Sequence, residues 1–84
     1  MDKKEIEEKT IKIIADVFGK KPEEIKRESR FIEDLHPSSM SMLALIGALS
    51  GEFGIQISSS EVQQNKTVGE AIDWLIKKLK EEGK

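Results

Sequence analysis

Residues 37–53, PSSMSMLALIGALSGEF, decide how the chain folds. Their apolar side chains have the spacing of an α-helix. The apolar residues of this run are Met40, Met42, Leu43, Leu45, Ile46, Leu49 and Phe53. Serines stand before the run, where a helix needs side-chain caps, and Gly51 and Gly54 mark where it weakens and ends. The stretch therefore predicts a long helix that begins at or just after Ser38 and Ser39.

Two more long amphipathic helices flank this one. The apolar positions of residues 6–18 have helical spacing, and Gly19, with a proline three residues later, predicts the end of this helix. Residues 68–79 follow Thr67 and Glu70, whose spacing is that of a capping box. The predicted buried stripes are Ile6, Thr10, Ile13, Ile14, Val17 and Phe18 in the first helix and Val68, Ala71, Ile72, Leu75, Ile76 and Leu79 in the last.

A short helix is expected between the second and last long helices. Residues 54–63, GIQISSSEVQ, begin as an extended segment in which Ile55 and Ile57 point inward. A serine cap then predicts one helical turn around Glu61 and Val62.

Residues 20–38 show no sustained period, so we expect a long loop between the first two helices. Apolar side chains should hold it on the core, namely Ile25, Phe31, Ile32 and Leu35. Three long helices and one short one predict an all-α four-helix bundle. We expect a single domain over residues 1–84, with frayed ends at about 1–3 and 81–84.

The composition excludes several classes of protein. A chain without cysteine has no disulfide, thiolate metal ligand or cysteine nucleophile, and His36 is its one histidine, so we expect no metal site. A net charge of −2, with 14 basic residues spread along the chain, provides no patch for nucleic acid. No apolar run reaches the ~18 residues that span a bilayer. We therefore expect no membrane insertion and a cytoplasmic protein.

The serines at the start of the second helix allow two interpretations. In the first, Ser38 is the N-cap and Ser39 and Ser41 are ordinary first-turn residues. In the second, one serine carries an anion such as a phosphate ester, because a helix N-terminus has unpaired N–H groups and a positive dipole end. A serine nucleophile is not expected, since its one candidate base, His36, has no orienting partner in the sequence. With room for only a modest core, the chain is not expected to be an enzyme.

Residues 31–57, FIEDLHPSSMSMLALIGALSGEFGIQI, resemble a segment of acyl carrier proteins. In that family Phe-x-Glu-Asp-Leu leads through Gly-x to Asp-Ser-Leu and then to an apolar helix closed by Glu-Phe. The matching positions are Phe31, Glu33, Asp34, Leu35, Leu45, Leu49, Glu52, Phe53 and Ile57. VFGKKPEEI and KTVGEAIDWL resemble the end of the family's first helix and its last helix, so the resemblance covers nearly the whole chain.

The resemblance places the family's modified serine at Ser39, counted either forward from Leu35 or back from Phe53. It implies that Ser39 carries 4′-phosphopantetheine, transferred from coenzyme A by a magnesium-dependent phosphopantetheinyl transferase. Acyl groups would then be held as thioesters on the thiol of this arm, and a chain without cysteine can obtain a thiol only there. Ser38 stands where the family has aspartate, and Met40 where it has leucine.

The resemblance also implies a shelter for the acyl chain and a surface for partner enzymes. The candidate pocket residues, which could equally be plain core, are Ile46, Leu49, Ile57, Val62, Ala71 and Leu75. The candidate partner surface consists of Ser38, Met40, Ser41, Ala44, Gly47 and Ala48. Glu52 is the one formal charge between residues 35 and 60, whereas the family's second helix is usually acidic. We therefore expect acyl-transferring or synthase enzymes of a dedicated pathway as partners.

Two other functions remain open on the sequence. The first is an unmodified carrier-like adaptor module, which Ser38, Met40 and the weakly charged helix favour. The second is a peptidyl or aminoacyl carrier, which shares the chemistry and loads amino acids. In each case we expect a monomer.

Overall fold

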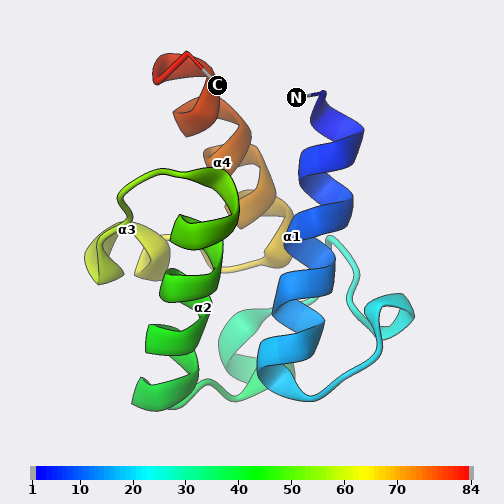
Figure 1. The fold of residues 1–84 in the computed structure, drawn as a ribbon. Coiled ribbons are helices and arrows are strands. Elements are labelled where there is room, and N and C mark those ends of the chain that lie inside the picture. The colour runs from blue at the N-terminus through cyan, green and yellow to red at the C-terminus, as the bar shows by residue number, and fades with distance from the viewer. Residues whose placement is uncertain (1, 84) are drawn as a thin grey trace.

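The computed structural model describes residues 2–83, most of which are helical (Figure 1). Its elements are α1 (Lys3–Phe18), the 3₁₀ turn η1 (Pro22–Glu24), the π-helical turn η2 (Phe31–Leu35), α2 (Ser39–Phe53), α3 (Ser59–Gln63) and α4 (Val68–Glu81). Three long helices and one short one confirm the predicted all-α bundle. The two short turns, which the sequence pattern did not predict, lie within the long connection between α1 and α2.

The ends of α1 and α2 follow capping signals in the sequence. Asp2 caps α1, because its side chain accepts a hydrogen bond from the N–H of Glu5 at 2.7 Å. Gly19 and Gly54 close α1 and α2 in the left-handed region, with φ of 67° and 64°. Both glycine stops are therefore confirmed. The prediction of frayed ends concerns motion and stays a prediction, and Met1 and Lys84 lie outside the described residues.

Serine and threonine caps begin the last two helices. Ser58 accepts from the N–H of Glu61 at 3.3 Å, and the Glu61 carboxylate accepts from the N–H of Ser58 in return. Thr67 likewise accepts from the N–H of Glu70 at 3.2 Å. The return bond differs from the prediction, because the Glu70 carboxylate accepts from the N–H of Lys66 at 3.1 Å. At α4 the return bond of the predicted capping box thus comes from Lys66, one residue before the N-cap Thr67.

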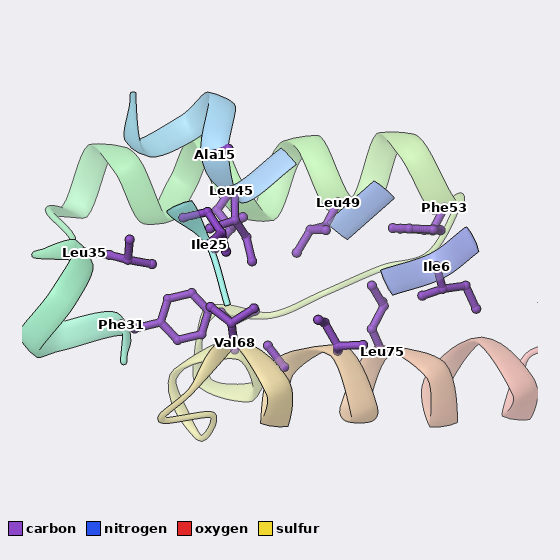
Figure 2. Close-up of a cluster of buried hydrophobic side chains, with 14 of the residues drawn as sticks. Ile6, Ala15, Ile25, Phe31, Leu35, Leu45, Leu49, Phe53, Val68 and Leu75 are labelled. Carbon is purple, nitrogen blue, oxygen red and sulfur yellow. The ribbon is translucent and has the colours of Figure 1, made fainter. Parts of the chain in front are cut away.

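The core lies between α1, α2 and α4. Figure 2 shows Leu45, Leu49 and Phe53 along the inner side of α2, where they meet Ile6 of α1 and Leu75 of α4. Each of these five side chains is at most 4% exposed. Burying a side chain of this size contributes ~1.5–3 kcal/mol to folding. The predicted stripes are buried, apart from half-buried residues at their edges, which are Ile13, Val17, Phe18 and Ile76.

Ile32, predicted to hold the long loop on the core, lies on the surface instead, as does Leu43 of the apolar run in α2. Ile32 is 73% exposed, because the short turn that buries Phe31 directs the next side chain elsewhere. Leu43 is 63% exposed, because it stands two residues before the buried Leu45 and so lies on the other side of α2. The predictions for Ile25, Phe31 and Leu35 are confirmed, since all three are buried.

Backbone hydrogen bonds tie the connection between α1 and α2 to the start of α4. The N–H of Val68 donates to the carbonyl of Ser29, and that of Gly69 to the carbonyl of Arg27, both at 2.9 Å. Two N–H groups that the first turn of α4 cannot pair within the helix thereby gain acceptors. Gly69 allows this approach, since a Cβ there would lie 3.1 Å from the Arg27 carbonyl oxygen. The connection is therefore an ordered part of the bundle.

Candidate functional site

The serines at the start of α2 differ in their hydrogen bonds. Ser38 is the N-cap, and its Oγ accepts from the N–H of Ser41 at 3.1 Å. The Oγ of Ser41 accepts in return from the N–H of Ser38 at 2.7 Å. These reciprocal bonds form a capping box. Ser41, predicted to be an ordinary solvent-facing residue, is half-buried and is the second member of this box.

Ser39 lies between the two members of the capping box and takes no part in it. It is the first residue of α2 and is exposed. Within residues 2–83, the Oγ of Ser39 makes no hydrogen bond, whereas the Oγ atoms of Ser38 and Ser41 are both hydrogen-bonded. An exposed hydroxyl at a helix N-terminus is accessible to another protein, and the unpaired backbone N–H groups beside it favour a negative group.

His36 forms the turn that leads into α2. Its backbone lies in the left-handed region, with φ of 52° and ψ of 62°, which suits glycine far better than a residue with a Cβ. The resemblance aligns this position with a glycine, which would hold the same conformation without a Cβ. Among the described residues, no hydrogen bond joins the His36 imidazole to Ser39.

A groove of about 890 Å³ begins at Ser39. It lies between η2, the first turn of α2 and the connection from α3 to α4. Phe31, Met42 and Val62 give it an apolar lining, and Asn65 adds a polar group on the α3–α4 side. The Nδ2 of Asn65 is buried without a hydrogen-bond partner in the described part of the chain. No feature of the sequence pattern distinguished Asn65.

The six candidate pocket residues are not gathered at this groove. Val62 is the one member that lines it. Leu49, Ala71 and Leu75 are buried in the core, and Ile46 packs against its edge. Ile57 borders a separate hollow near the C-terminal end of α2. The pocket assignment of the six therefore stays a prediction, and would require the packed core to open.

The candidate partner surface lies mostly in the open. Its exposed members are Ser38, Met40, Ala44, Gly47 and Ala48. Met40 is 75% exposed, and Leu43, which is 63% exposed, adds a second large apolar side chain. Glu52, the one formal charge within α2, pairs with Lys9 at 3.4 Å. The outer face of α2 is thus apolar and nearly uncharged.

Metal-binding clusters and membrane-spanning helices are both absent from the described part of the chain. Residues 2–83 contain no group of three or more His, Cys, Asp or Glu residues able to hold a metal ion. They also contain no helix with the length and hydropathy needed to cross a bilayer.

Comparisons with known proteins bear on the same site. Residues 8–75 match the family described as a phosphopantetheine attachment site. Proteins named acyl carrier protein from two strains of Nitratidesulfovibrio vulgaris, DP4 and Hildenborough, are each 41% identical over 73 residues, covering 87% of this chain and 96% of theirs. The solved acyl carrier protein of Enterococcus faecalis matches with a TM-score of 0.73 and 28% identity, over 92% of this chain and 98% of that one. The chain therefore belongs to the acyl carrier protein family, which is defined by a phosphopantetheine attachment site.

Proposed function

We propose that the hydroxyl of Ser39 is the attachment point of 4′-phosphopantetheine, received from coenzyme A. The observation that supports this choice is the hydrogen bonding of the serines. Ser38 and Ser41 hold each other in the capping box, whereas the Ser39 hydroxyl makes no bond within the described residues. Ser39 can therefore be modified without dismantling the start of α2.

The surroundings of Ser39 fit such a group. The first turn of α2 contains no acidic residue, so a phosphodiester there meets the positive end of the helix dipole without a like charge in that turn. An exposed anion in this position gains ~0.3–1 kcal/mol. The groove that begins at Ser39 has an apolar lining for a hydrocarbon chain and, in Asn65, a buried donor that lacks an acceptor.

The attachment chemistry assigns a passive role to this chain. A bond forms between Ser39 Oγ and phosphorus, the bond to the leaving 3′,5′-ADP breaks, and the hydroxyl proton passes to a base. We assign that base to the transferase, because no carboxylate or imidazole of residues 2–83 hydrogen-bonds Ser39. Once attached, the arm supplies a thiol for acyl thioesters, which a chain without cysteine cannot provide itself. The protein is then a carrier that delivers acyl groups to enzymes and catalyses nothing.

Intact mass and free-thiol titration test this proposal directly. The chain is expressed with a broad-specificity phosphopantetheinyl transferase and supplied with coenzyme A. We expect a mass increase of one phosphopantetheine and a stoichiometric thiol, with Ser39→Ala abolishing both. Ser41→Ala and Ser38→Ala serve as matched controls that keep the Ser39 hydroxyl. Loss of loading in Ser41→Ala but not in Ser39→Ala would refute the assignment, and no loading of the wild type would favour an unmodified adaptor.

The neutral outer face of α2 supports partners from a dedicated pathway. Complementary charges speed the encounter of two proteins and disfavour wrong partners. An enzyme whose basic surface binds an acidic helix would meet only one carboxylate on α2, that of Glu52, which is already paired with Lys9. The exposed Met40 and Leu43 offer apolar contact instead. We expect slower acylation by a general fatty-acid-pathway transferase than an acidic carrier undergoes. Equal rates with equal salt dependence would contradict this. Loading of amino acids, the cytoplasmic location and the monomeric state remain predictions from the sequence.

A further inference from the structure

The Asn65 side chain carries a donor that the protein does not satisfy. Its Nδ2 is buried and has no hydrogen-bond partner in the described part of the chain. A buried amide N–H has lost its bonds to water, so a folded protein rarely leaves one unpaired. The backbone N–H of the same residue is satisfied, since it donates to the carbonyl of Val62 at 3.1 Å. The unpaired donor of Asn65 therefore belongs to its side chain.

The chain holds Asn65 firmly in the wall of the groove. Asn65 lies two residues after the end of α3, and the carbonyl of its neighbour Lys66 accepts from the N–H of Phe31 at 3.0 Å. Thr67 then caps α4. Hydrogen bonds on both sides thus fix the backbone of the connection, which also lines the groove that begins at Ser39. A ligand attached to Ser39 and lying in the groove passes along this wall.

Three of the neighbouring polar side chains in the groove already have partners within the protein. The Glu70 carboxylate accepts from the N–H of Lys66, and Thr67 Oγ1 accepts from the N–H of Glu70. The Arg30 guanidinium pairs with Glu33 at 3.0 Å. Gln63 and Lys66 also bring side-chain donors to the groove, but both residues are exposed to water, whereas Asn65 Nδ2 is buried.

We infer that the Asn65 amide donates a hydrogen bond to a carbonyl oxygen of the group that Ser39 bears. This inference rests on the proposed attachment at Ser39. A buried N–H requires an acceptor, which a saturated hydrocarbon chain does not provide. Carbonyl oxygens, all of them hydrogen-bond acceptors, occur in the amides of the arm, in a thioester, and in a 3-oxo group on the acyl chain. Phe31 and Val62, which line the same groove, would contact the methylene groups that separate these carbonyls.

Nuclear magnetic resonance of the Asn65 side-chain amide tests the inference without relying on enzyme turnover. The probes are uniformly ¹⁵N-labelled protein in four forms: unmodified, loaded with the arm, butyrylated and 3-oxobutyrylated. The Asn65 NH₂ peaks are assigned from their disappearance in Asn65→Leu. Gln64→Leu is the matched control, because Gln64 is exposed, adjacent, and outside the groove. Circular dichroism establishes that both variants keep the helical fold.

We expect one Nδ2 proton of Asn65 to move downfield and exchange more slowly with water once its carbonyl partner is present. A shift on loading alone identifies an arm amide, a shift first seen on butyrylation identifies the thioester, and one first seen on 3-oxobutyrylation identifies the 3-oxo group. The Gln64 peaks should stay in place. Full loading at Ser39 without any Asn65 shift in the four forms overturns the inference and leaves the proposed function standing. Failure to load at Ser39 removes both.

Discussion

Alanine substitutions at Ser38 and Ser39 should separate capping of α2 from attachment. Ser38→Ala removes the acceptor for the Ser41 N–H, and replacing an N-cap serine with alanine costs typically ~1 kcal/mol of folding free energy. Ser39→Ala removes no hydrogen bond within the described residues. It places a better helix former at the first position of α2, so the expected change is a stabilisation between zero and ~0.5 kcal/mol. The two neighbouring serines should thus respond with opposite signs.

Urea unfolding of the unmodified protein, followed by far-ultraviolet circular dichroism, measures both effects. Thermal unfolding gives the same result in another form, because a loss of 1 kcal/mol lowers the melting temperature of a domain of this size by about 4–8 °C. The Ser38/Ser41 double-mutant cycle should show coupling, because the two side chains form reciprocal bonds. If Ser39→Ala destabilises the protein as much as Ser38→Ala, the Ser39 hydroxyl has a structural role and the reasoning is wrong.

Four other substitutions test local geometry and the charge of Glu61. His36→Gly should stabilise the fold by ~0.5–1 kcal/mol in urea unfolding. The substitution removes ~1–2 kcal/mol of strain from the left-handed backbone of residue 36, and the greater backbone freedom of glycine in the unfolded chain offsets part of this gain. Gly69→Ala should destabilise by ~1–3 kcal/mol in the same assay, because its Cβ meets the loop backbone, whereas Gly47→Ala, which faces open space, should stabilise. A hydrogen bond from the backbone N–H of Ser58 and, next in size, one from Lys78 lower the pKa of Glu61. The stability that the Glu61 carboxylate contributes is therefore present above its ordinary pKa of 4.5, and it is lost as the pH falls through the lower pKa of the folded state. Glu61→Gln should therefore flatten the acid limb of stability against pH.

The long helices could be predicted because several local signals agreed in the sequence. At α2, helical spacing, leading serines and a closing glycine all pointed to the same element, and the caps at Ser38 and Gly54 match it. Helical spacing alone did not distinguish the buried residues of this run from the exposed ones. Leu43 fits an apolar run, yet α2 has one inward face, and Leu45, Leu49 and Phe53 already fill it. Counting from these three residues would have placed Leu43 outside.

The connection between α1 and α2 was predicted only in outline, because tertiary contacts shape it. Its buried anchors could be recognised from their hydrophobicity. The position of η2 and the docking against α4 depend on partners some forty residues away, such as Arg27 with Gly69. Asn65 was missed for the same reason, since an unpaired donor is visible only when its neighbours are known.

The neutral cap at Ser38 makes the charge at the start of α2 depend on modification. The resembling family places an aspartate there, so its helix has a permanent negative charge near the dipole end. Here the first turn has no acidic residue, and a phosphodiester at Ser39 would be the first anion it receives. Loading should therefore stabilise this protein by ~0.3–1 kcal/mol. Ser38→Asp should stabilise the unmodified form by a similar amount and reduce the gain on loading, because two neighbouring anions repel. Equal gains on loading in both proteins, measured by urea unfolding at low salt, would show that the cap charge and the modification are independent.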